Sequence, residues 1–265
     1  QGHVPGAAMS FTLFYLIRTG GDGISNRRIL LAGFLAPLMV ITEYPLAVHA
    51  LVLGIYAFFT VRKKSRLLWL LPGMAAVTAV FLVYNRAAFG GWFEVGYHYE
   101  VIERYAEGHS GGIVGVGMPD LSALYLLTVE PGHGLFVTTP FLLFAIPGAY
   151  IALKSSRWRG GAAAAVAICI LYFIVMAGYF DPSERHLVPV IPYLCYLCAF
   201  PLASPGAVRR GVFAGLAAVS VATYALTTAG AVPQTLQYVE LPALKLYLPL
   251  LMDGVARPGW LDSFL

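Results

Sequence analysis

Two uncharged apolar runs of near membrane-spanning length, residues 160–179 and 187–203, are separated by a short charged segment. That segment contains Asp181, Arg185 and His186. Apolar runs of roughly 17–25 residues are typical of transmembrane helices, and continuous instead of alternating runs exclude a transmembrane barrel. A charge cluster between two such runs is a functional-site candidate, and an ordinary solvated hairpin loop is the competing interpretation.

Composition indicates the same class of protein. Of the 265 residues, 59% are hydrophobic and only 11% are charged, whereas soluble domains carry about 25% charged residues. The sequence therefore predicts an all-α, polytopic helical membrane protein with about eight membrane segments and one large extracytoplasmic loop. The chain begins at Gln1 without a signal-peptide pattern, and we expect further residues upstream. Cys195 and Cys198 lie in an apolar run, where we interpret them as packing residues.

Polar interruptions divide the chain into four regions. These are N-terminal membrane helices, an extracytoplasmic loop, C-terminal membrane helices and an extracytoplasmic interfacial tail, at residues 1–84, 85–133, 134–231 and 232–265. The first region contains a short hairpin at 29–61, because Pro45 disfavours helical geometry in the residue before it. The loop contains an apolar stretch at 121–129 that we expect to form an interfacial helix, and Trp260 marks the tail as interfacial.

The basic residues are distributed unevenly along this path. With the segments on alternating sides, 12 of the 17 Lys and Arg fall on one face and five on the other. The positive-inside rule makes the first face cytoplasmic. Of the 13 acids only Asp22 lies on that face, and the histidines other than His49 lie toward the opposite face. We therefore expect chemistry or ligand binding on the extracytoplasmic side.

Glu43 and Tyr44 lie at the tip of the short hairpin. Its thirteen-residue first arm, 29–41, rises only about 20 Å as a helix, less than the hydrocarbon core of roughly 30 Å. Glu43 would then lie below the membrane surface, where a carboxylate must face a cavity or a partner. A longer, tilted helix with Glu43 among the headgroups is the alternative.

The extracytoplasmic loop mixes aromatic residues that can stack on a sugar with acids and histidines. Tyr97, Glu94 and His98 lie close together in the sequence. The spacing of Glu94 and His98 would place them on one helical face, but the surrounding glycines disfavour a helix and a metal site. His133 precedes the next apolar run and is a further pocket candidate, with simple solvation as the alternative.

Arg185 and His186 are the candidate phosphate ligands, and an ion pair of Arg185 with Asp181 or Glu184 within the loop is the alternative interpretation. The guanidinium of Arg185 offers a planar fork of donors that matches phosphate oxygens. The chain contains no Gly-rich phosphate loop, zinc-protease motif or Ser-His-Asp order, and we expect neither a nucleic-acid partner nor a metal cofactor.

Several short motifs in this order resemble the C-type (GT-C) membrane glycosyltransferases, specifically the bacterial dolichyl-phosphate-mannose mannosyltransferase-like group. They are LAGFL at 31–35, TEYP at 42–45, FGGWFEVGY at 89–97, GVGMPD at 115–120, GHGLFVTTP at 132–140 and ERHLVPVIP at 184–192. The resemblance implies a polyprenyl-phosphate-linked sugar donor, membrane lipid as surroundings, and transfer at the extracytoplasmic face of the bacterial inner membrane. It also implies a catalytic Asp in a first outer loop, which we expect upstream of Gln1 or on another chain.

On this interpretation Arg185 and His186 bind the donor phosphate, and the pocket for sugar or acceptor is lined by Glu43, Tyr44, Glu94, Tyr97, His98 and His133. Two other classes stay open. One is a non-catalytic, transferase-like scaffold subunit of a larger membrane complex. The other is a transporter. The sequence argues against a transporter, because it shows no charge in the middle of a span and no internal repeat.

Overall fold

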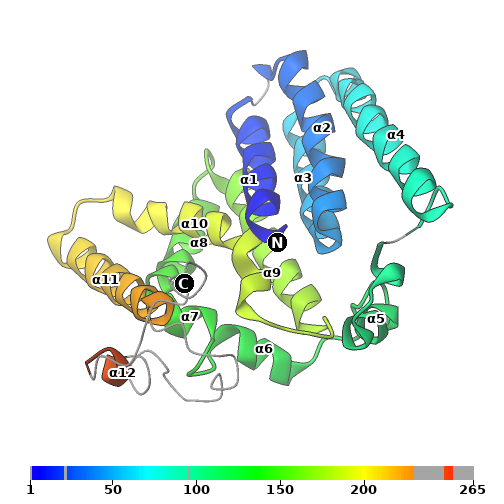
Figure 1. The fold of residues 1–265 in the computed structure, drawn as a ribbon. Helices are drawn as coiled ribbons and strands as arrows, with labels where there is room; N and C mark the ends of the chain where they lie inside the picture. The colour runs from blue at the N-terminus through cyan, green and yellow to red at the C-terminus, as the bar shows by residue number, and fades with distance from the viewer. Residues whose placement is uncertain (1, 21–22, 95, 230–247, 253–265) are drawn as a thin grey trace.

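A computed structural model describes residues 2–20, 23–94, 96–229 and 248–252, and the regular elements of that part of the chain are helices (Figure 1). Its α-helices and 3-10 helices (η) are, in order, α1 (His3–Gly20), α2 (Asn26–Thr42), η2 (Tyr44–Leu46), α3 (Ala47–Thr60), η3 (Lys64–Trp69), α4 (Leu70–Phe89), η4 (Gly96–Tyr99), α5 (Glu103–Ser110), α6 (Leu121–Thr128), α7 (Leu135–Thr138), η5 (Pro140–Phe144), α8 (Ala145–Lys154), α9 (Arg159–Ala177), η6 (Glu184–Val190), α10 (Ile191–Ala203), α11 (Ala207–Ala229) and α12 (Leu248–Met252). Within those ranges β structure is limited to isolated bridges. The all-α prediction is confirmed, whereas most of the expected tail at 232–265, with Trp260, lies outside the described residues.

Contacts between helices define how they are arranged across the molecule. α4 packs on α2, α2 on α1, and α3 on α9, while α8 packs on both α9 and α10. In Figure 1, α4 lies at one edge, α11 at the other and α9 near the centre. The core between α1, α3, α9 and α10 buries Phe14, Leu53, Ile168, Tyr172 and Tyr193.

Two helices, α2 and α3, occupy the segment that was expected to form a hairpin at 29–61. α2 begins after Ser25, whose side chain accepts a hydrogen bond from the Arg28 amide as an N-cap. It ends at Thr42, Glu43 adopts an extended conformation, and α3 begins at Ala47 after the η2 turn. Pro45 lies inside that turn, so the chain reverses where the proline indicated.

Small residues let α2 and α4 approach closely. A Cβ added to Gly33 would lie 2.2 Å from the carbonyl oxygen of Leu70, and one added to Gly73 would lie 2.7 Å from that of Leu30. Glycine interfaces of this kind are common between membrane helices, because attraction there depends on close backbone packing.

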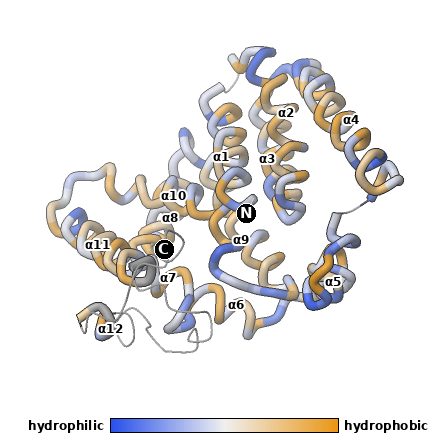
Figure 2. The backbone as a smooth tube through the Cα atoms, in the orientation of Figure 1, coloured by the Kyte–Doolittle hydropathy of each residue, from blue (hydrophilic) through white to orange (hydrophobic). Residues whose placement is uncertain are grey.

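Three helical segments in the described part of the chain are long and apolar enough to cross a membrane, namely Lys64–Phe89, Arg159–Ala177 and Glu184–Ala203. In the first, only 6% of the apolar window is buried inside the protein, and Figure 2 shows that apolar residues recur along α4. An apolar surface of that extent requires lipid or another chain to cover it. The run expected to span continuously at 134–153 instead breaks at Thr139, between α7 and η5. The count of eight segments stays a prediction.

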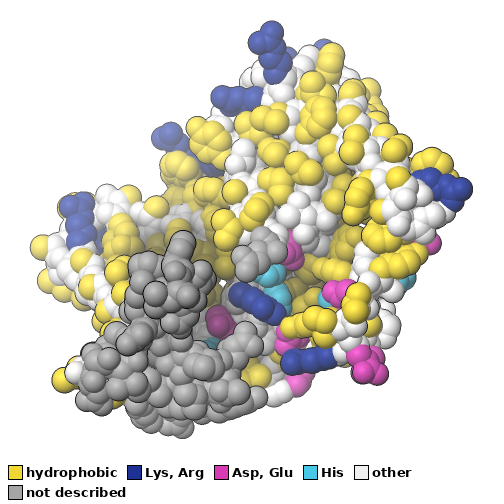
Figure 3. Space-filling model, viewed as in Figure 1, with side chains coloured by type: hydrophobic (Ala, Val, Ile, Leu, Met, Phe, Trp, Pro, Cys, Tyr) yellow, Lys and Arg dark blue, Asp and Glu magenta, His cyan; other side chains and the backbone are white. Residues whose placement is uncertain are grey.

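The two ends of the helices differ in character. At one end, Arg18 donates to the carbonyl of Arg157 at 3.1 Å, and Arg66 donates to that of Ile24 at 3.0 Å. These contacts bring together basic loops that were expected on a single face. Figure 3 shows Lys and Arg without visible acids along the top and left margins, whereas the visible acids and histidines lie toward the lower centre and right, together with further Lys and Arg.

A buried polar network joins α1, α3 and α10. Ser10 Oγ lies 2.7 Å from His49 Nδ1 and 2.7 Å from the Tyr193 hydroxyl. Buried polar groups of this kind are nearly always hydrogen-bonded; the network satisfies Nδ1 of His49, whereas its Nε2 has no hydrogen-bond partner among the described residues.

Candidate functional site

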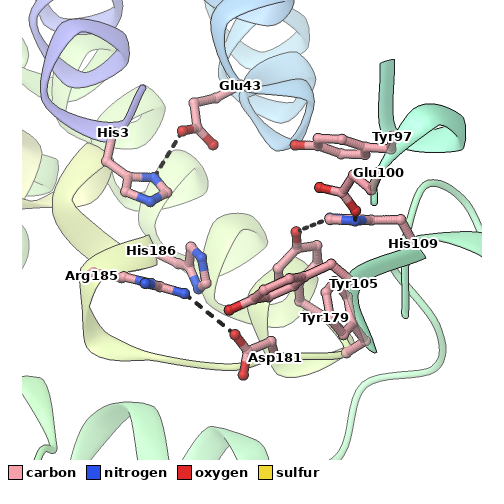
Figure 4. A pocket seen from close by; sticks show the side chains of 11 residues that line it. His3, Glu43, Tyr97, Glu100, Tyr105, His109, Tyr179, Asp181, Arg185 and His186 are labelled. Carbon is pink, nitrogen blue, oxygen red and sulfur yellow. Dashed lines mark hydrogen bonds and ion pairs between the residues drawn. The ribbon is translucent and has the colours of Figure 1, made fainter. Parts of the chain in front are cut away.

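A cavity of about 220 Å³ lies at the end of the molecule where α1 begins and α2 and α9 end. Figure 4 shows its labelled side chains converging from segments far apart in the sequence, from His3 at the start of α1 to His186 in η6. The lining residues are His3, Glu43, Tyr97, Glu100, Tyr105, His109, Tyr179, Phe180, Asp181, Arg185 and His186. Ionisable and aromatic groups make up the whole lining, which is unusual for a cavity between apolar helices and marks it as the candidate site.

Glu43 reaches the cavity from the tip of the hairpin. Its side chain is 14% exposed, and its Oε1 lies 3.1 Å from Nδ1 of His3. The contact is at ion-pair distance but lacks hydrogen-bond geometry. The His3 ring also meets the ring of His186 edge-on at 4.9 Å. Glu43 was expected to face a cavity or a partner, and its side chain lines this cavity.

Glu100, His109 and Tyr179 form a continuous hydrogen-bonded series on the opposite wall. Glu100 Oε2 lies 2.7 Å from His109 Nδ1, and His109 Nε2 lies 2.7 Å from the Tyr179 hydroxyl. The Tyr97 ring stacks on the His109 ring at 3.8 Å between centroids. Burial raises the pKa of Tyr97 to about 12, helped by repulsion from the nearby Glu43, Tyr44 and Glu100.

Asp181, in the loop before η6, joins two arginines beside the cavity. Asp181 accepts hydrogen bonds from Arg104 at 3.1 Å and from Arg185 at 3.4 Å. Arg185 is 58% exposed at the rim. His186 is buried beneath it, with Ser183 Oγ 3.2 Å from its Nδ1.

The turn at 111–117 fastens the loop that follows α9. Phe180 N donates to the carbonyl of Gly115, and Gly117 N donates to that of Gly178. Gly115 adopts a φ of 82°, a left-handed conformation that favours glycine. These contacts hold Tyr179 and Phe180 against α5, so this wall of the cavity is positioned by backbone hydrogen bonds.

Four of the residues selected from the sequence line the cavity: Glu43, Tyr97, Arg185 and His186. Tyr44 lies just behind it, with its ring edge-on to Tyr97 at 5.2 Å.

The other three selected residues do not line the cavity. Glu94 lies against Gly91 beyond the end of α4, and its carbonyl accepts a hydrogen bond from Asn85 at 2.8 Å. His98 is exposed on η4, and the His133 amide donates to Glu130 in a separate turn.

Seven lining residues were not selected from the sequence. Some of them stand next to residues that were selected, and others have no distinguishing sequence pattern. Asp181 stands in the charged segment that drew attention to Arg185, and Glu100 follows Tyr97 closely. His3 and His109 belong to short polar stretches without a recognisable pattern. Only the packing of α1 against α2 and of α5 against the loop after α9 brings them to the cavity.

Within the described residues, no group of three or more His, Cys, Asp or Glu is arranged to hold a metal ion. The lining instead offers carboxylates as acceptors, aromatic faces and one guanidinium as a donor. Such a set suits a hydroxyl-rich ligand with an anionic group at one end.

No protein-family model matches this chain, and comparison with curated proteins and with solved structures gives no significant match either.

Proposed function

We propose that this chain is part of an integral-membrane glycosyltransferase. It would transfer a sugar from a polyprenyl-phosphate donor to an acceptor on the extracytoplasmic side of a bacterial inner membrane. The observation that carries the proposal is the cavity at the acid- and histidine-rich end of apolar helices, with Arg185 at its rim. The motif order that resembles the C-type glycosyltransferases supports the same class.

Arg185 supports the phosphate-binding role through its position and its available donors. Its one hydrogen bond within the described residues goes to Asp181, which Arg104 also contacts. Most of the N–H groups of the guanidinium fork are therefore available at the rim. The lining is otherwise rich in carboxylates, so an anionic headgroup needs this cation to enter.

The interior of the cavity supports the sugar-binding role. Glu43 and Glu100 supply carboxylate oxygens that accept hydrogen bonds from hydroxyl groups. Tyr97, Tyr105 and Tyr179 supply aromatic faces beside them. The exposed apolar surface of α4 supports a lipid environment, in which the polyprenyl tail of a donor would be soluble.

The test is donor binding by the purified chain in matched detergent. Wild type should bind a polyprenyl-phosphate sugar, and Arg185→Ala should bind it roughly tenfold or more weakly, because one charge-assisted pair is worth about 1.5–3 kcal/mol. Arg86→Ala removes an exposed arginine at the end of α4 and is the matched control for general charge attraction. Equal affinities for wild type and Arg185→Ala would remove the phosphate role. An absence of binding by wild type would favour the scaffold subunit.

A further inference from the structure

Glu100, His109 and Tyr179 form a connected series of three side chains in the wall of the cavity. They come from the segment after η4, from α5 and from the loop after α9, and two 2.7 Å contacts connect them in series. The His109 side chain is only 6% exposed. All three residues line the cavity, and in Figure 4 the Tyr179 hydroxyl meets His109 at one end of the series.

The direction of the hydrogen bonds follows from the carboxylate. An ionised Glu100 can only accept, so Nδ1 of His109 carries the hydrogen that it donates. In the neutral ring Nε2 then has a free lone pair and accepts from the Tyr179 hydroxyl. The lone pairs of the Tyr179 oxygen are thereby left to accept a hydrogen bond from a ligand hydroxyl in the cavity.

The surrounding side chains hold this arrangement in place. Tyr97 stacks on His109 at 3.8 Å, and Phe180 meets the same ring edge-on at 4.6 Å. Tyr179 is itself fixed by its bridge to Val116. A catalytic group needs this kind of support, because small displacements of its atoms reduce the rate strongly.

We infer that Glu100, His109 and Tyr179 form a proton relay that deprotonates the acceptor hydroxyl during sugar transfer. The inference rests on the proposed function, and it assigns to this chain the base that the resemblance places in a first outer loop. The acceptor oxygen forms a bond to the anomeric carbon as the bond from that carbon to the phosphate oxygen breaks. The electron pair leaves with the polyprenyl phosphate. The acceptor proton passes to the Tyr179 oxygen while the Tyr179 proton passes to His109 Nε2.

The charges around the relay fit this direction of transfer. The resulting imidazolium of His109 is paired with the Glu100 carboxylate and later releases its proton to water. Burial raises the pKa of Tyr179, and the charges of Glu43, Glu100 and Asp181 add to the effect. Tyr179 therefore keeps its proton until it can pass it to His109, and no free phenolate is required. Tyr179 is the residue that touches the reacting hydroxyl, and His109 and Glu100 position and support it.

The experiment measures turnover and donor affinity separately for the whole chain with a polyprenyl-phosphate sugar and an alcohol acceptor. Tyr179→Phe keeps the ring but removes the hydroxyl, and should lower kcat roughly 10²- to 10⁴-fold with donor affinity unchanged. Glu100→Gln keeps an acceptor for Nδ1 but removes the charge, and should lower kcat by a smaller factor. Tyr84→Phe and Glu107→Gln change exposed residues of the same types outside the cavity and should behave as wild type.

Imidazole rescue separates a chemical from a structural role. His109→Ala leaves a space between the rings of Tyr97 and Phe180. Added imidazole should restore part of the turnover of His109→Ala and none of that of Tyr179→Phe. Wild-type turnover by Tyr179→Phe, or parallel loss of kcat and affinity without rescue, would overturn the relay and leave donor binding intact. Donor binding without transfer by wild type would also overturn the relay, whereas no donor binding would reject the proposed function itself.

Discussion

His3 and Glu43 meet at 3.1 Å between Nδ1 and Oε1, where the start of α1 passes the end of α2. Both side chains are largely shielded, at 20% and 14% exposed. The exposed part of each side chain faces the cavity, where it can contact a ligand. His3 and Glu43 together therefore form one wall of the candidate site, at the segment between α2 and α3.

Glu43→Gln should weaken binding of the sugar donor without unfolding the protein. The amide keeps the shape of the side chain but loses the charge that strengthens hydrogen bonds from sugar hydroxyls, a loss of about 1.5–3 kcal/mol. Affinity measured by titration in detergent should fall roughly tenfold or more. Glu103→Gln, an exposed glutamate on α5, is the control. Full affinity and full turnover of Glu43→Gln would reduce Glu43 to an interfacial charge.

The orientation of the chain in a membrane can be tested with single cysteines. In a background without Cys169, Cys195 and Cys198, a membrane-impermeant maleimide applied to intact cells should label Ser110→Cys and leave Ser65→Cys unlabelled. Both positions are exposed on the protein surface, so only the membrane distinguishes them. Ser65 lies among the basic residues expected inside. Equal labelling of the two would contradict both the topology and an outward-facing site.

Features that depend on residues close together in the sequence, such as helices and turns, could be predicted from the sequence. Apolar runs specified the helices, and Pro45 marked the hairpin turn that the structure contains. Residues beside those features, such as Glu43 and Arg185, could be selected as site candidates because a charge next to an apolar run is costly without a function.

The rest of the site depends on contacts between distant segments. His109 and Tyr179 are 70 residues apart in the chain, and no periodic pattern links them. Their contact follows from the turn at 111–117, whose amides and carbonyls pair with the segment after α9. Glu94 and His98 illustrate the same limit. They are close to Tyr97 in the sequence, but they do not line the cavity that Tyr97 lines.

Stability should fall at alkaline pH partly through Tyr97. Its pKa in the folded protein is raised to about 12 by burial and by repulsion from neighbouring negative groups, whereas an unfolded tyrosine titrates near 10. The contribution is thus fully present below about pH 10 and is lost as the pH rises toward about 12. Thermal unfolding of wild type in detergent should show this loss, and Tyr97→Phe should show less of it. Tyr84→Phe, which changes an exposed tyrosine, should retain the wild-type dependence, and a Tyr97→Phe curve parallel to wild type would contradict the assignment.

Gly33→Ala should destabilise the protein through the contact between α2 and α4. The added methyl would lie 2.2 Å from the Leu70 carbonyl oxygen, and a backbone atom cannot move aside without separating the helices. Overpacking of this kind costs about 1–3 kcal/mol. Gly54→Ala in α3 is the matched control, because nothing lies within 4 Å of its added methyl and alanine favours a helix over glycine by about 0.5–1 kcal/mol. Thermal unfolding in detergent should therefore shift downward for Gly33→Ala and remain level or rise for Gly54→Ala. A Gly33→Ala protein as stable as wild type would show that α4 does not pack on α2 through these glycines.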